Sequence, residues 1–214
     1  AGDDLARRLF PDIDLIDYDQ AVRDALSQLE AGLVETAWTD ALASSQGYIP
    51  PVVLTTQEGM IIEKRQLSLE TPAETVYQAF SSLGGKTGWL TMNWAWRLRG
   101  LADRMIGGVG LRRGRRHPQD VRVGDAIDFW RVEAVEPGRL LRLRAEMKVP
   151  GRAWLQFQAQ PLQDGKTLLV QTAFFAPKGL SGLLYWYLLY PIHGLIFGKM
   201  IRKIAQRAQS LYAS

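Results

Sequence analysis

The sequence of 214 residues contains no cysteine and only two histidines. The absence of cysteine excludes disulfide bonds, thiolate nucleophiles and cysteine-ligated zinc, and it is compatible with a reducing compartment. The two histidines, His117 and His193, are far apart in the sequence, and no clustered acidic motif accompanies them. We therefore expect no metal site in this chain and a cytoplasmic location.

The sequence also lacks repeats and low-complexity segments, because its ten prolines and twenty glycines are scattered along the chain. Its first four residues, AGDD, do not resemble the basic start of a signal peptide. The length allows one domain with an N-terminal extension. The sequence does not begin with methionine, so a processed start, a tag remnant and a fragment of a longer chain are all open at this point.

Basic side chains are concentrated in one segment. The formal net charge is +4, but residues 1–40 carry ten acidic and three basic side chains, so the rest of the chain carries +11. Seven arginines and a single acid, Asp103, fall between Arg97 and Arg116. Such a segment attracts phosphates, nucleic acid, acidic lipid or an acidic protein surface, and the acidic N-terminal segment could itself be that surface.

Four arginines form the sharpest local cluster: Arg112, Arg113, Arg115 and Arg116. Guanidinium groups match phosphate and carboxylate groups bidentately, so the cluster is a candidate anion-binding site. The alternative is a solvated loop. We expect no nucleic acid partner, because the aromatic residues are not interleaved with the arginines as a stacking platform requires.

The N-terminal half of the sequence predicts helices around one strand. A short helix begins at Tyr18, where Asp17 can cap it, and residues 43–60 lack any period and read as a linker. Alternation over 61–69 predicts a strand. Thr71, Pro72 and Glu74 then form the pattern of a capping box at a helix start. Residues 94–105 predict another helix, with apolar side chains on one side and arginines on the other.

The C-terminal half predicts four strands and a long helix. The strands cover residues 127–135, 139–149, 153–160 and 167–175, and tight turns such as Asp164-Gly165 separate them, so they pair antiparallel. From Leu180 the chain is helical to near its end. These elements predict an α+β domain over residues 61–214, in which a curved antiparallel sheet closes around a long C-terminal helix and encloses a cavity. Residues 1–42 form a short helical N-terminal extension.

The segment of residues 179–198 is long and apolar enough to span a bilayer. It contains no acidic or basic side chain other than His193. Pro191, four glycines and the position of the aromatic residues in mid-segment argue against a span. An apolar helix can also be buried in a core. We expect core and cavity lining, with membrane contact as an alternative.

Six residues are candidate ligand-binding residues: Trp94, Arg97, Asp128, Trp130, Arg131 and His193. A tryptophan can stack on a flat ligand, and a charged side chain in an apolar cavity marks the end of the cavity that holds a polar group. Each has a structural alternative: a core tryptophan, a buried ion pair with Arg97 or Arg99, or a histidine packed in an apolar helix. No catalytic residue is assigned.

Several strings together carry a family likeness: GKTGW at 85–89, WAWRLRG at 94–100, GGVGLRRGRR at 107–116, DFWRVE at 128–133, AEMK at 145–148, and YW at 185–186 followed by PIH at 191–193. The chain resembles, over about residues 18 to 212, the uncharacterised domain that follows a Rossmann dinucleotide-binding domain in bacterial proteins like nucleoside-diphosphate-sugar epimerases.

This resemblance implies similarity to the START-like, polyketide-cyclase helix-grip superfamily, which binds apolar ligands. It also implies an upstream Rossmann domain, which could bind NAD(P), and of which residues 1–42 would be the end. The chain itself has no G-x-G-x-x-G after a strand, so we expect no cofactor in it.

Three functions stay open from the sequence. The first is binding of a small apolar molecule with a polar or anionic end, as the C-terminal domain of a Rossmann-containing protein. The second is a cavity enzyme of cyclase or isomerase type that uses Asp128, Arg131 or His193. The third is a membrane-surface or protein-interaction module that uses residues 179–198.

Overall fold

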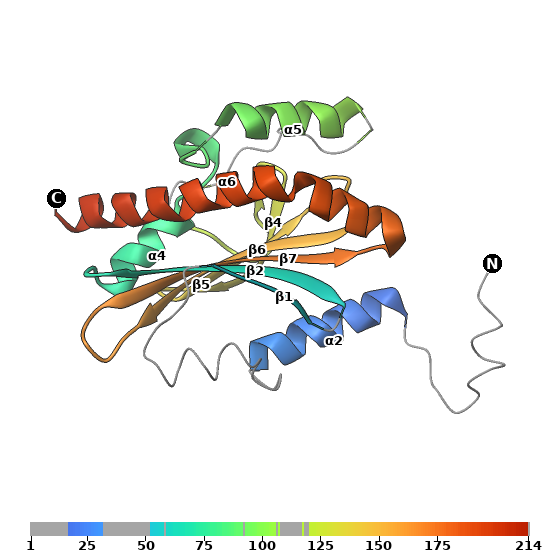
Figure 1. Ribbon diagram of the computed structural model, residues 1–214. Coiled ribbons are helices and arrows are strands. Elements are labelled where there is room, and N and C mark those ends of the chain that lie inside the picture. The colour runs from blue at the N-terminus through green and yellow to red at the C-terminus, as the bar shows by residue number, and fades with distance from the viewer. Residues whose placement is uncertain are drawn as a thin grey trace. The chain divides into compact units, whose positions relative to one another are not determined.

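A computed structural model describes residues 17–31, 52–57, 59–91, 93–105, 107, 117 and 120–213 (Figure 1). The chain divides into two compact units, residues 1–48 and 49–214. The described element of the first unit is helix α2 (Tyr18–Ala31). It begins where the sequence predicts, and the Asp17 carboxylate caps it by accepting a hydrogen bond of 3.2 Å from the backbone N–H of Asp19.

The second unit contains a seven-stranded sheet in the order β1-β2-β7-β6-β5-β4-β3, in which every neighbouring pair is antiparallel. The strands are β1 (Val52–Gln57), β2 (Met60–Leu69), β3 (Ala126–Ile127), β4 (Trp130–Glu136), β5 (Leu140–Ala145), β6 (Gly151–Pro161) and β7 (Thr167–Pro177). The helices are α4 (Ala73–Ser81), the 3-10 turn η1 (Gly85–Thr87), α5 (Asn93–Met105) and α6 (Gly179–Tyr212).

The core lies between the sheet and helices α4 and α6, which share one face of the sheet (Figure 1). Phe80 of α4 stacks on Phe157 of β6 with 5.7 Å between ring centroids. Met200 and Ile204 of α6 are completely buried in the same core. A curved antiparallel sheet around a long C-terminal helix is the helix-grip arrangement, so the predicted α+β fold is confirmed.

Three local predictions from the sequence are wrong. Strand β1 lies inside segment 43–60, where we expect a linker; it pairs with β2 through a hairpin that turns at Gly59, whose φ of +73° suits glycine. The strand predicted over 127–135 is interrupted, because Asp128 adopts a φ of +52° and ends β3. The strand predicted over 139–149 ends at Ala145.

The predicted capping box does not form at the start of α4. Pro72 occupies the N-cap position, and no side chain caps the helix. Thr71 is buried, and its carbonyl oxygen accepts a hydrogen bond of 2.7 Å from the Thr167 hydroxyl of β7. Thr71 therefore lies one residue before the N-cap position, and its contact is with the sheet.

Candidate functional site

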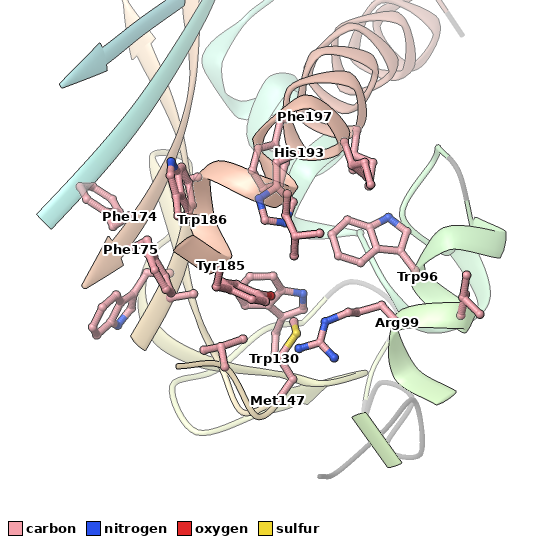
Figure 2. A pocket seen from close by; sticks show the side chains of 18 of the residues that line it. Trp96, Arg99, Trp130, Met147, Phe174, Phe175, Tyr185, Trp186, His193 and Phe197 are labelled. Carbon is pink, nitrogen blue, oxygen red and sulfur yellow. The ribbon is translucent and has the colours of Figure 1, made fainter. Parts of the chain in front are cut away.

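A pocket of about 350 Å³ lies between the sheet, α5 and the N-terminal half of α6 (Figure 2). Helix α5 contributes Trp94, Trp96, Leu98 and Arg99. The strands and their connections contribute Trp130, Met147, Val149, Ala153, Trp154, Ala173, Phe174 and Phe175. Helix α6 contributes Tyr185, Trp186, Leu189, Ile192, His193, Ile196 and Phe197.

Small side chains on the sheet leave room for this pocket. Ala153 of β6 and Ala173 of β7 both line it, on neighbouring paired strands. Because successive side chains of a strand point to opposite faces, Ala173 and Phe175 lie on the same face of β7. Phe175 then reaches Trp186 of α6, while the two alanines are too short to fill the space between sheet and helix at the level of the pocket.

A row of aromatic rings holds α6 against the sheet along one side of the pocket. Phe175 stacks on Trp186 with 5.4 Å between ring centroids. Trp186 lies 5.6 Å from His193, and His193 stacks on Phe197, also at 5.6 Å. Figure 2 shows these side chains on the strand and helix walls, facing Trp96 and Arg99 on the opposite wall. The pocket is therefore predominantly aromatic.

Helix α5 is joined to the rest of the unit by rings and by hydrogen bonds. Trp96 lies 5.5 Å from Trp89 and 5.6 Å from Phe129, ring centroid to ring centroid. The buried Asp103 carboxylate accepts a hydrogen bond of 2.7 Å from the backbone N–H of Lys148. These contacts place one side of α5 over the pocket.

Among the described residues that line the pocket, Arg99 is the one permanently charged side chain, and none is an aspartate or glutamate. Its Nη2 donates a hydrogen bond of 3.0 Å to the carbonyl oxygen of Lys148, and its Nη1 lies 4.0 Å from Asp103 Oδ1. These two contacts fix the guanidinium group, which points into the pocket in Figure 2. The pocket wall therefore carries a positive charge at one end.

Several residues that line the pocket have a buried polar atom without a hydrogen-bond partner. The indole Nε1 atoms of Trp96, Trp130, Trp154 and Trp186 are buried and have no protein partner in the described part of the chain. His193 Nδ1 is buried without a partner as well. Buried polar groups are normally hydrogen-bonded, because an unpaired one costs about 1–3 kcal/mol. All five residues are among those that line the pocket.

His193 is neutral at pH 7. Burial and, second, the positive charge of Arg99 lower its pKa to about 4. The pocket therefore favours an anionic or electron-rich group over a cationic one.

The structure brings three of the six candidate residues to this pocket: Trp94, Trp130 and His193. Arg131 does not line it; its Nε donates a hydrogen bond of 3.0 Å to Glu146 Oε1 and its Nη1 donates one of 2.7 Å to the carbonyl oxygen of Gly124. The side chain of Arg97 lies outside the described residues, as do Arg112, Arg113, Arg115 and Arg116.

Asp128 is also absent from the pocket wall, because the left-handed backbone at this residue turns its side chain elsewhere. Its Oδ2 accepts a hydrogen bond of 2.8 Å from Trp89 Nε1. Burial raises the pKa of this carboxyl, and the Trp89 hydrogen bond opposes that rise. Asp128 therefore ties the segment after α4 to the β3–β4 turn through Trp89, which differs from the buried ion pair considered from the sequence.

The six candidate residues from the sequence do not include Arg99, Trp96 or Trp186. The first two lie one helical turn apart, so a helix over 94–105 does place them together. Other positions of α5 also hold tryptophan or arginine, however, and the sequence pattern does not show which side of the helix meets the sheet. The side that carries Trp94, Leu98, Leu101 and Met105 is largely exposed.

Comparison with known protein families identifies one match. Residues 60–200 match the family described as protein of unknown function (DUF2867). No protein with a curated description matches the sequence.

Solved structures match with low scores. Norcoclaurine synthase from Thalictrum flavum is 11% identical over 74% of this chain and 96% of its own, with a TM-score of 0.42. Zhui aromatase/cyclase from Streptomyces sp. R1128 is 13% identical over 70% and 94%, with a TM-score of 0.39. CalU16 from Micromonospora echinospora is 14% identical over 76% and 94%, with a TM-score of 0.36. At these values the likeness says nothing about ligand or reaction.

Proposed function

The chain belongs to the family described as protein of unknown function (DUF2867), and we propose that it binds a small, largely apolar molecule with an anionic or polar end in the pocket between α5, α6 and the sheet. One observation carries this proposal. Among the described residues, this aromatic pocket is lined by Arg99 and by four tryptophans whose buried indole N–H groups have no protein partner, and by no carboxylate.

The body of the ligand would lie among the aromatic and aliphatic side chains. A pocket of about 350 Å³ is within the ordinary range for small-molecule sites, which are mostly apolar with a few placed polar groups. Phe175, Trp186 and Phe197 offer ring faces and edges to a flat or hydrocarbon ligand. The polar end would lie near Arg99, where a carboxylate or phosphate can accept charge-assisted hydrogen bonds.

Binding is favoured over catalysis. In the described part of the chain, no hydrogen bond or ion pair joins two titratable side chains of the pocket wall, and Asp128 and Arg131 are engaged elsewhere. A general base needs an orienting partner within hydrogen-bond reach. Neutral His193 without such a partner is better suited to accept or donate one hydrogen bond to a bound ligand.

Filling the pocket should abolish binding. The Ala153→Trp variant places an indole in the space that the ligand would occupy. We therefore expect the affinity for the fluorescent probe phenylnaphthylamine to fall by at least about a hundredfold, which is a larger loss of binding free energy than the removal of one buried ring contact would cause. Fluorescence titration measures this change. Native mass spectrometry of the purified wild-type chain, followed by extraction, would identify a copurifying natural ligand.

The control for this variant is Gln160→Trp, which adds the same side chain at an exposed end of the same strand. We expect it to bind the probe like the wild type. If Ala153→Trp folds and also binds like the wild type, the probe does not occupy this pocket and the proposed site is wrong.

Arg99 should select for a negative charge on the ligand. We expect Arg99→Met to weaken binding of anilinonaphthalene sulfonate by about tenfold or more, since a hydrogen bond to a charged group contributes about 1.5–3 kcal/mol. Binding of phenylnaphthylamine, which lacks the sulfonate, should change little. Fluorescence titration of both probes gives the ratio of their two affinities in each protein.

The matched control is Arg104→Met, an exposed arginine of the same helix that does not line the pocket. It should leave both affinities unchanged. An equal loss of both probes in Arg99→Met would mean that Arg99 supports the pocket wall rather than the anion.

Other expectations from the sequence stay predictions. They are a preceding Rossmann domain that could bind NAD(P), a bacterial and cytoplasmic protein, and an anion-binding role of the four clustered arginines. The proposed pocket needs none of them, because every side chain in its argument belongs to the described residues.

A further inference from the structure

Helix α6 exposes one apolar stripe along its N-terminal half. Six large side chains at helical spacing are at least half exposed: Leu180, Leu184, Tyr187, Leu188, Ile192 and Leu195. Helix α5 exposes a second stripe, formed by Trp94, Leu98, Leu101 and Met105, whose exposed fractions run from 57% to 81%. We call these ten side chains the apolar surface. A patch of this size on a soluble domain marks a contact with another apolar body.

The pocket opens within this surface. Trp94 and Leu98 of α5 and Ile192 of α6 belong to the apolar surface and also line the pocket. The two stripes therefore meet around the mouth of the pocket. Whatever covers the apolar surface also covers the route by which a ligand enters.

The charges around the apolar surface are positive. Residues 178–199 contain no acid, and the exposed Lys178 and Lys199 stand at either end of the α6 stripe. On α5, Arg104 is exposed, whereas the acid of that helix, Asp103, is buried and hydrogen-bonded to the Lys148 backbone. An apolar face with basic residues at its edges matches an anionic lipid surface, and exposed aromatic side chains such as Trp94 and Tyr187 suit the headgroup region.

Helix α6 passes the length and composition test for a membrane span. Its other side, however, packs against the sheet. Gly182 lies against the Pro150 carbonyl oxygen and Pro177, and Trp186 is buried on Phe175. The C-terminal half of the helix is part of the core. A helix held along its length by its own domain, with one apolar stripe outward, is suited to lie on a bilayer surface rather than to cross it.

We propose that the apolar surface docks on an anionic lipid bilayer with the mouth of the pocket against the lipid. Docking requires only the two stripes and their basic edges. Its consequence for the ligand, which rests on the proposed function, is that an apolar molecule passes between bilayer and pocket without crossing water. The chemical class of the ligand would then be a membrane-soluble amphiphile with an acidic or polar end.

The test uses cosedimentation with vesicles made of equal parts phosphatidylcholine and phosphatidylglycerol. We expect the wild-type chain to sediment with these vesicles, and more weakly with pure phosphatidylcholine or in high salt, which screens the basic residues. In the double variant Leu184→Asp, Leu188→Asp, we expect the partition coefficient to fall by at least about tenfold, because two exposed leucines no longer enter the lipid.

The control is Val123→Asp, which places one such charge at an apolar side chain that is as exposed as Leu184 but lies on neither helix. It should bind vesicles like the wild type. All variants should keep the wild-type affinity for phenylnaphthylamine in solution, so a failure to dock is distinguishable from a failure of the pocket.

Two outcomes would overturn the proposal. The first is a wild-type chain that stays in solution with every vesicle. The second is a double variant that loses concentration-dependent self-association but sediments with vesicles unchanged, since the apolar surface would then bind a second copy of the chain.

Discussion

Replacing Gly182 by alanine is expected to lower the free energy of unfolding by about 2–3 kcal/mol, the cost of forcing extra volume into a packed contact. A Cβ atom at this position would lie 2.5 Å from the carbonyl oxygen of Pro150 and 2.8 Å from the Cα of Pro177. Both are backbone atoms that cannot rotate away. The helix must therefore move off the sheet, although alanine favours helix over glycine by about 1 kcal/mol. Urea unfolding measures the difference.

This displacement should also reach the pocket. Trp186 lies one turn after Gly182 and stacks on Phe175, so a shifted helix opens that contact. We expect a weaker affinity for phenylnaphthylamine in the same variant.

Gly194→Ala is the matched control, because it makes the same change in the same helix. Its Cβ would meet only the Nη2 of Arg65 at 3.6 Å, an ordinary contact. This variant should be as stable as the wild type or more stable by up to about 1 kcal/mol. Equal effects of the two substitutions would mean that Gly182 does not fix the position of α6.

Acidification from pH 7 to pH 4 should destabilise the wild-type chain by up to about 3 kcal/mol more than the His193→Phe variant. The pKa of His193 is lowered from 6.5 to about 4, mainly by burial. In the unfolded chain, His193 therefore binds a proton below about pH 6.5. In the folded chain, His193 binds this proton only when the pH falls to about 4. The stabilisation is fully present above the unfolded pKa and is lost as the pH falls through the folded pKa.

The measurement is the free energy of unfolding of both proteins across this pH range. Phenylalanine keeps the ring between Trp186 and Phe197 but cannot be protonated. Other carboxyl groups titrate in both proteins and cancel in the difference. A difference that does not change with pH would show that His193 is accessible to solvent and has an ordinary pKa.

Most of the strands, and helices α5 and α6, could be predicted from the sequence because each has a clear local pattern. Alternation over 153–160 and 167–175 predicts β6 and β7 within two residues at each end. Strand β1 was missed because its apolar and polar residues do not alternate, and only its pairing with β2 shows it to be a strand. The break at Asp128 depends on a backbone angle that no periodicity records.

The candidate site could be predicted only in part. His193 and Trp130 stand out by chemistry, as a histidine in an apolar helix and a tryptophan in a strand, and both reach the pocket wall. Arg99 and Arg97 are two residues apart on one helix and look alike in sequence. What distinguishes Arg99 is its hydrogen bond to Lys148 on a distant loop, and only tertiary structure supplies that contact.

The order of the strands has a consequence for the time course of folding. Strand β2 is made early, yet its inner neighbour is β7, so that Ile61 pairs with Phe175. Closing a loop of this length is entropically costly before any contact compensates for it, and proteins dominated by such distant pairings fold slowly. During synthesis, β2 and α4 leave the ribosome long before β7 and α6. Until then only α4 can cover the apolar side of the growing sheet, and such transiently exposed apolar surface makes an incomplete chain prone to aggregate.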